Sequence, residues 1–202
     1  MAAMRQEQGL AMKTDARRKG AALVIALTAG LVAGITVSPA DAYEPADLPS
    51  IEVKVEADYA KVTHLAPDGL EAMLADKDRM LLIDVREEEE FRVSRIPGAT
   101  RVDPGTWSWT FLARHGQEAA GKAVVFYCSV GVRSSKLAAS VQEGLKQRGA
   151  VGVYNLRGGI FRWHNESRAL AADRGATDLV HPYDDKWGGL VARKPLSSRT
   201  PR

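Results

Sequence analysis

Three short apolar segments, separated by stretches with helical or turn character, constrain the fold of this chain most strongly. Residues 80–85 (MLLIDV), 123–127 (AVVFY) and 151–156 (VGVYNL) have the length and apolar character of strands that are buried on both faces. The stretch 134–148 between the last two segments has helical spacing, with one apolar side formed by Leu137, Ala138, Val141 and Leu145. Strands that alternate with helices predict an α/β fold with a parallel sheet.

The other predicted elements are shorter. Alternation predicts a strand at 61–65, and a further short strand is predicted at 100–102. Helical spacing or turn character predicts short helices at 68–78, 87–91, 111–115 and 159–163.

The N-terminus has the pattern of a secretory signal peptide. Residues 20–37 carry no charge, basic residues occupy 17–19, and Ala-Asp-Ala follows at 40–42. We expect residues 1–42 to be removed and the mature protein to be periplasmic or secreted. The alternative is an uncleaved anchor that faces outside the cytoplasm, because the apolar run approaches the roughly 18–20 residues that cross a bilayer. A start at Met12 would give the basic region a more usual length.

The charge of the chain resides partly in this segment. The whole sequence has a net charge of +3 and a pI of about 9.0, which invites a nucleic-acid interpretation. However, residues 1–42 contain five of the 28 Lys and Arg and three of the 25 Asp and Glu, so the remainder carries only +1. We therefore expect no nucleic-acid partner, and membrane association only if the N-terminal segment is uncleaved.

The chain after residue 42 divides into three regions. Residues 43–60 hold two prolines and little periodicity, and they predict an extended lead-in. Residues 61–172 form the predicted α/β domain. Residues 173–202 form a C-terminal extension, whose aromatic segment 181–190 is expected to pack on the domain and whose end, 193–202, is expected to be disordered.

Cys128, the only cysteine of the chain, marks the candidate active site. It follows the strand at 123–127 and precedes a helix by one short loop, so it lies at the edge of the sheet where α/β proteins bind ligands. The loop amides, the helix N-terminus and Arg133 would stabilise an anion there, whether a thiolate, a persulfide or a bound oxyanion. This setting favours a nucleophilic thiolate. The alternative is that Cys128 is only a small buried apolar side chain without a chemical role, which is common for free cysteine.

Other residues have weaker claims to function. A single cysteine excludes an intramolecular disulfide framework and a zinc site built on several thiolates. The four histidines show no metal-ligand spacing, so no metal site is expected. Asp84 and Arg86 end a predicted strand and could face the same crevice as Cys128. Trp107 and Trp109 could line its rim, although we expect them to serve in packing.

Four separated motifs occur in order along the domain. They are Leu82–Arg86 with Glu90-Phe91, Arg95–Ala99, Cys128–Ser134 in the pattern Cys-x-x-Gly-x-Arg-Ser, and Leu156–Ile160 with Trp163. Through these motifs the chain resembles a single-domain rhodanese, a thiosulfate sulfurtransferase-like protein, over about residues 61–170. Arg95 stands where the family usually has His, at a position that is mostly structural.

The resemblance implies a rhodanese fold, with a five-stranded parallel sheet flanked by helices on both faces, and no metal or organic cofactor. It also implies an enzyme that moves a sulfane sulfur from a small-molecule donor such as thiosulfate to a thiol or cyanide acceptor, through a persulfide on Cys128. Asp84 and Arg86 would brace the active loop. The transferred sulfur would be bound by Ser129, Val130, Gly131, Val132 and Arg133.

Two alternatives to this function stay open. The chain could be a non-catalytic persulfide carrier that serves a protein sulfur acceptor. Alternatively, it could be a phosphatase or arsenate reductase. In the related dual-specificity phosphatases five residues separate the cysteine from the arginine, whereas here there are four, Ser129–Val132, which form a tighter cradle.

Overall fold

The computed structural model describes residues 43 and 46–202, and the segment assigned to a signal peptide, residues 1–42, lies outside them. No helix within the described part of the chain has the length and apolar character needed to cross a membrane. The elements are, in order, α1 (Leu48–Asp58), β1 (Thr63–Leu65), α2 (Pro67–Met73), η2 (Lys77–Arg79), β2 (Met80–Asp84), α3 (Glu88–Val93), β3 (Thr100–Arg101), α4 (Ser108–His115), β4 (Ala123–Tyr127), α5 (Val132–Gln147), β5 (Gly152–Leu156), α6 (Gly159–Asn165), β6 (Leu170–Ala172), β7 (Gly175–Thr177), α7 (Asp185–Gly188) and η3 (Lys194–Leu196).

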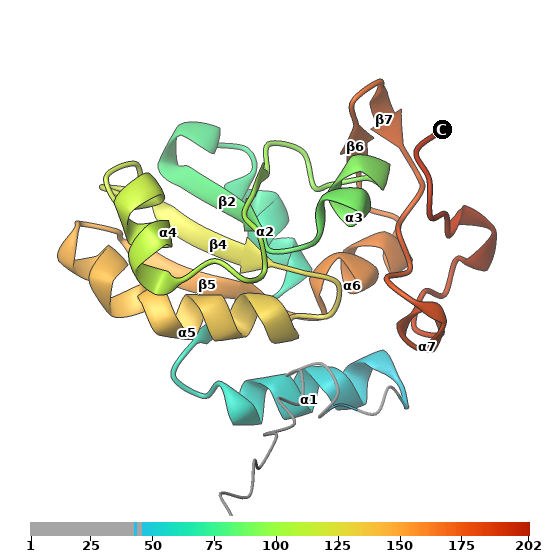
Figure 1. Ribbon diagram of the computed structural model, residues 1–202, viewed down its shortest axis with the longest axis horizontal. Coiled ribbons are helices and arrows are strands. Elements are labelled where there is room, and N and C mark those ends of the chain that lie inside the picture. Colours follow the sequence, from blue (N-terminus) through green and yellow to red (C-terminus); the bar gives the residue numbers. More distant parts are fainter. Residues whose placement is uncertain (1–42, 44–45) are drawn as a thin grey trace, which may run out of the picture. The chain divides into compact units, whose positions relative to one another are not determined.

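Five strands form one sheet in the order β1-β5-β4-β2-β3, and every neighbouring pair is parallel (Figure 1). The long apolar runs of the sequence occupy its centre, because β2 is buried at all five positions and β4 at all but its first. Asp84 pairs in register with Tyr127, so β2 and β4 end side by side. The predicted α/β fold with a five-stranded parallel sheet is confirmed.

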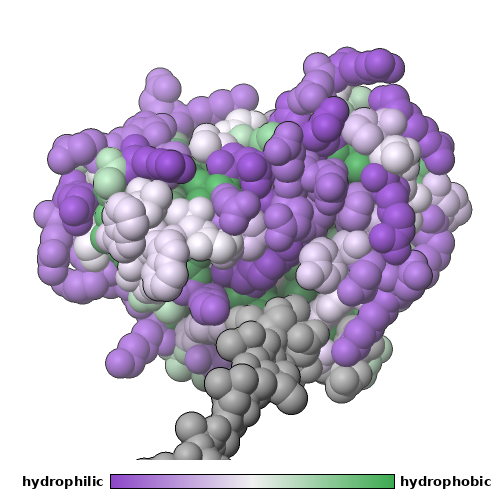
Figure 2. Space-filling model, in the orientation of Figure 1, coloured by the Kyte–Doolittle hydropathy of each residue, from purple (hydrophilic) through white to green (hydrophobic). Residues whose placement is uncertain are grey.

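Alternate side chains of the sheet pack into two apolar layers. On β4, Val124 and Phe126 join the cluster that includes Phe111 of α4 and the apolar side of α5. Val125 and Tyr127 point to the opposite face, where the cluster draws on α1, α2 and α6. The surface outside these layers is mainly hydrophilic in the orientation of Figure 2, where apolar side chains show chiefly in recesses.

Residues 48–58 form a helix, so the extended lead-in predicted for residues 43–60 is wrong. Asp47 caps the helix by accepting a hydrogen bond from the Ser50 amide at 2.7 Å, and Pro49 lies in its first turn, where a missing N–H is harmless. Ile51 and Val55, one turn apart, are each 2% exposed and face the core. Pro49 therefore marks the start of a helix that packs on the domain.

The C-terminal extension is part of the folded domain. The hairpin β6–β7 joins the Arg95 turn through a bridge between Arg95 and Ala171. Trp187 and Leu190 are buried, so the segment 181–190 packs on the domain as expected. The last residues were predicted to be disordered. In the structure Val180 donates to Leu196 O and Ser198 donates to Val180 O, both at 3.0 Å, so a backbone ladder holds this segment.

Candidate functional site

Cys128 directly follows the last residue of β4, at the C-terminal edge of the sheet. α5 begins at Val132, two residues before the helical stretch predicted from residue 134. Val132 and Arg133 therefore lie in its first turn, and the loop itself is only 128–131. The cysteine is 1% exposed. The thiol therefore lies beneath the surface, not in the open crevice that its position in the sequence suggests.

Gly131 provides the backbone donor for the sulfur. Its amide donates to Sγ of Cys128 at 3.2 Å (N···S). The residue has φ +103°, a region that side chains disfavour, and a Cβ there would lie 3.1 Å from Nδ2 of Asn155. Only glycine fits both requirements, which explains this position of the Cys-x-x-Gly-x-Arg-Ser motif.

The carbonyl groups of the loop are held by α6. The amides of Ile160 and Phe161 donate to the carbonyls of Cys128 and Ser129 at 2.9 and 3.0 Å. Gly159 permits this approach, because a Cβ there would meet Cys128 O at 2.4 Å, and its φ is +56°. Since the C=O and N–H of one peptide point in opposite directions, these bonds turn the amides of Ser129 and Val130 away from α6.

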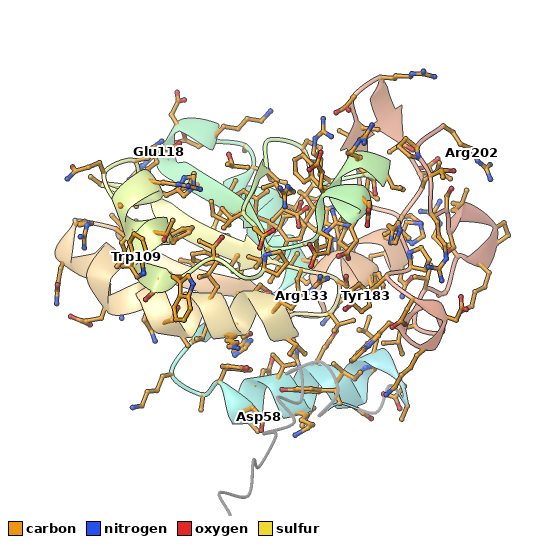
Figure 3. The ribbon with its side chains drawn as sticks, viewed as in Figure 1. Asp58, Trp109, Glu118, Arg133, Tyr183 and Arg202 are labelled. Atoms are coloured by element: carbon orange, nitrogen blue, oxygen red, sulfur yellow. The ribbon has the colours of Figure 1, made fainter. Side chains whose placement is uncertain are left out.

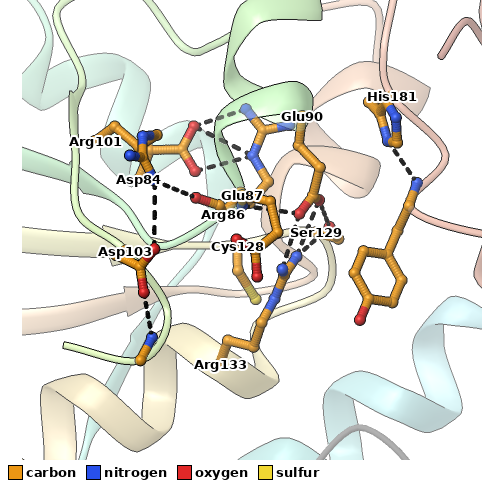
Figure 4. A network of polar contacts seen from close by, with 12 residues as sticks. Asp84, Arg86, Glu87, Glu90, Arg101, Asp103, Cys128, Ser129, Arg133 and His181 are labelled. Atoms are coloured by element: carbon orange, nitrogen blue, oxygen red, sulfur yellow. Dashed lines mark hydrogen bonds and ion pairs between the residues drawn. The ribbon is translucent and has the colours of Figure 1, made fainter.

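Glu90, Arg133 and Ser129 form a buried polar cluster beside the cysteine (Figure 4). Arg133 donates to both carboxylate oxygens of Glu90, at 2.8 and 2.9 Å, and to Ser129 Oγ at 2.9 Å. Ser129 Oγ in turn donates to Glu90 at 2.7 Å. Burial alone would raise the pKa of Glu90, but the hydrogen bonds and charge of Arg133 lower it overall. Glu90 is therefore a carboxylate that fixes both other side chains.

Asp84 and Arg86 form a second buried ion pair next to this cluster. Nε of Arg86 donates to Asp84 Oδ1 at 2.9 Å, and Nη2 donates to Oδ2 and to the Ser94 carbonyl, both at 2.6 Å. The guanidinium also lies over the ring of Tyr127, 5.7 Å from its centroid. The pair thus braces the strand end just before Cys128 and the Ser94 segment, whereas its predicted role was to brace the cysteine loop by hydrogen bonds.

A small pocket opens at the cysteine. Its volume is about 20 Å³, close to the space that one water molecule occupies. It is lined by Cys128, Ser129, Val130, Val132, Arg133, Tyr183 and Trp187. Figure 3 shows Arg133 of α5 and Tyr183 of the C-terminal extension approaching each other, with Arg133 Cζ 4.8 Å from the centroid of the Tyr183 ring.

The structure brings the predicted loop residues together around Sγ and adds three residues that sequence reasoning did not assign to the site. Glu90 belonged to a quoted motif and follows Glu87 at capping-box spacing, but nothing local links it to Ser129 or Arg133. Tyr183 and Trp187 were expected only to pack. Trp107 and Trp109 are 73% and 69% exposed, so the expectation that they serve in packing is wrong. Phe111 supplies the inner face of α4 instead.

Comparison with known proteins identifies the domain. The family model described as Rhodanese-like domain matches residues 66–166. A sulfurtransferase of Allochromatium vinosum is 31% identical over 114 residues, which cover 56% of this chain and 99% of that protein. A tRNA uridine(34) hydroxylase of Teredinibacter turnerae is 32% identical over 108 residues, or 52% of this chain and 32% of that protein.

The chain spans less than half the length of the two tRNA uridine(34) hydroxylases that match at 32% and 30% identity, with 32% and 46% of their lengths covered. Among solved structures, a thiosulfate sulfurtransferase from Pseudomonas aeruginosa is similar with a TM-score of 0.48 at 23% identity. The likeness covers 62% of this chain and 23% of that chain.

Proposed function

The chain belongs to the rhodanese-like domain family of sulfurtransferases, and from this premise we propose that it transfers a sulfane sulfur through a persulfide on Cys128. One observation carries the proposal: the Gly131 amide points at Sγ from a loop that leads into a helix N-terminus. Such donors stabilise a negatively charged sulfur. No residue of the described site needs a metal or an organic cofactor for this chemistry.

The reaction has two displacement steps. In the first, the Cys128 thiolate attacks the outer sulfur of a donor such as thiosulfate, and the bond to the sulfite sulfur breaks with its electron pair, which releases sulfite. In the second, an acceptor thiolate or cyanide attacks the terminal sulfur, and Cys128 leaves as the thiolate. A covalent intermediate between the two steps predicts ping-pong kinetics.

Each loop residue has a proposed part in holding the transferred sulfur. The amides of Ser129, Val130 and Gly131 face a terminal anionic sulfur, while the side chains of Val130 and Val132 keep water away from it. Arg133 maintains the loop through Ser129 and Glu90, and its charge is opposed there by the carboxylate. The Asp84–Arg86 pair keeps β2 and β4 aligned beneath the loop.

Steady-state kinetics with thiosulfate and cyanide test the proposal. We expect parallel lines in double-reciprocal plots and no turnover by Cys128→Ser. A protein that forms the persulfide but passes its sulfur to a single protein partner would be the carrier instead. Hydrolysis of a phosphate ester, with no sulfur transfer from any sulfane donor, would contradict the proposal and favour the phosphatase.

We also propose that the protein is exported and that residues 1–42 direct its export. The support is the basic, apolar and small-residue order of that segment. N-terminal sequencing of the protein recovered from the cell of origin tests this. A start at Tyr43 is expected, whereas a start upstream of residue 20 would indicate an anchor or no export.

A further inference from the structure

The C-terminal extension reaches the cysteine pocket from outside the region that the family model matches, which ends at residue 166. Val180 and Val191 are fully buried and Trp187 is 5% exposed. The side chain of Asn165 fastens the segment, since it donates to Leu190 O at 2.9 Å and accepts from the Ala192 amide at 2.8 Å. The extension is therefore a fixed part of the site's surroundings.

Tyr183 is held in a strained conformation over the pocket. Its φ of +68° lies in the left-handed region, which is uncommon for a bulky residue and occurs where the surroundings impose it. His181 Nδ1 accepts a hydrogen bond from the Tyr183 amide at 3.0 Å, and the ring lies against the Arg133 guanidinium. Arg133 is itself fixed by Glu90, so the ring has a defined place at the pocket.

The pocket that results is small, with a volume of about 20 Å³. Two of the seven lining residues, Tyr183 and Trp187, come from the extension, and together with Val130 and Val132 they give the pocket a largely apolar wall. The positive charge of Arg133 is paired with Glu90, and that of Arg86 with Asp84. A dianionic, branched group at the mouth would meet these rings, and the residues that line the described pocket offer no unpaired positive charge to offset its lost hydration.

We propose that Tyr183 and Trp187 are specificity-determining residues that select unbranched persulfides, R–S–SH, over thiosulfate as the sulfur donor. This inference rests on the proposed function of Cys128. The thiolate of Cys128 attacks the terminal sulfur of R–S–S⁻, a new S–S bond forms, and the old S–S bond breaks with its electron pair on the leaving thiolate R–S⁻. The terminal sulfur fits the small pocket, and the inner sulfur of the persulfide carries a single carbon substituent in place of three oxygens. Thiosulfate would have to place three sulfonate oxygens against the Tyr183 ring.

Tyr183→Gly tests the proposal, because it removes the ring and also relieves the strain of a positive φ, so the fold is expected to persist. Tyr183→Phe keeps the ring, and Trp109→Ala removes an exposed aromatic side chain that does not line the pocket. The first readout is the alkylation rate of Cys128 by iodoacetamide and by a bulky maleimide. The second is kcat/KM for thiosulfate relative to glutathione persulfide. Circular dichroism checks that each variant is folded.

We expect Tyr183→Gly to raise the bulky-to-small alkylation ratio and the thiosulfate-to-persulfide ratio, each by about tenfold, which is the scale on which a single apolar pocket contact discriminates between substrates. Tyr183→Phe and Trp109→Ala should keep both ratios at wild-type values. Unchanged ratios in folded Tyr183→Gly would overturn the proposal. A changed alkylation ratio with no persulfide formed from any donor would instead overturn the proposed function. It would still show that the Tyr183 ring limits access to Cys128.

Discussion

Arg133 donates its terminal N–H groups to Glu90 and Ser129, and its guanidinium stacks on Tyr183. The sequence predicted that the charge of this arginine would help to stabilise an anion at the cysteine. In the structure a carboxylate already opposes its charge, because Glu90 projects from the first turn of α3 toward the same point. Arg133 therefore supports the loop, and the amide of Gly131 remains the donor that faces the sulfur directly.

Glu90→Gln tests the supporting role of this pair. The amide keeps the shape of the side chain but removes the charge opposite a largely buried guanidinium, so we expect a loss of about 1–3 kcal/mol in the free energy of unfolding at pH 7. Because the pKa of Glu90 is lowered, its ionised form stabilises the fold at pH values above the ordinary pKa of 4.5. This contribution disappears as the pH falls through the lowered pKa. Urea unfolding of both proteins from pH 7 to pH 3 should show their difference shrinking with acid. A constant difference would contradict the ion pair.

At the scale of elements, α6 approaches the backbone of the cysteine loop closely, since its amides donate to Cys128 O and Ser129 O at 2.9 and 3.0 Å. Gly159→Ala would place a methyl group against Cys128 O, in addition to the cost of a positive φ. Gly98→Ala is the matched control, since Gly98 has φ +85° and nothing within 4 Å of the added methyl. We expect Gly159→Ala to lose at least about 2 kcal/mol more stability than the control in urea unfolding, together with most of its sulfur transfer. Equal losses would show that the close approach is not required.

Helix α1 precedes the region matched by the family model yet packs on the same core. Glu52 on this helix is 6% exposed and pairs with Arg162 and Arg157 at 3.0 and 3.1 Å. Ile51→Ala removes a side chain that is 2% exposed and should lower the free energy of unfolding by about 2–5 kcal/mol. Val53→Ala, on the exposed face at 61%, should change it by less than about 0.5 kcal/mol. Thermal or urea unfolding measures both, and equal effects would mean that α1 does not contribute to the core.

The elements that sequence analysis predicted well are those with a strong local signal. The short apolar runs of β2 and β4 are typical of central strands, and Gly149, with φ +92°, lies just after the end of α5, where glycine is common. α1 was missed because its prolines suggested a loop, although Asp47 and Pro49 form a start signal. β6 and β7 were missed because three-residue strands carry too little pattern to detect.

At the scale of the whole molecule, residues distant in sequence complete the site. Cys128, Gly131 and Arg133 share one motif, and their placement followed from the sheet edge and the helix start. Glu90 and Tyr183 come from other parts of the chain, and no local rule predicts such long-range contacts. The sequence therefore identified the sulfur and its loop, whereas the burial of the thiol depends on how the C-terminal extension packs.

The attachment of this extension should make stability depend on pH. His164 is fully buried, its Nε2 contacts Asp178 O at 3.0 Å, and burial together with the charge of Arg193 lowers its pKa below the ordinary 6.5. The unfolded chain binds the proton more readily than the folded one, so stability should fall as the pH drops from above 6.5 toward the lowered value. Urea unfolding between pH 7.5 and pH 5.5 should show a smaller decline for His164→Gln than for the wild type. Parallel declines would assign the pH dependence to other groups.

The central claim is that Cys128 carries the transferred sulfur, and mass spectrometry of the protein after exposure to a sulfane donor tests it most directly. Thiosulfate and glutathione persulfide serve as the two donors, and Cys128→Ser is the control. We predict a gain of about 32 Da on the peptide that contains Cys128, its removal by cyanide, and no gain in the serine variant. A protein that shows no adduct with either donor, or the same adduct in Cys128→Ser, would contradict the account.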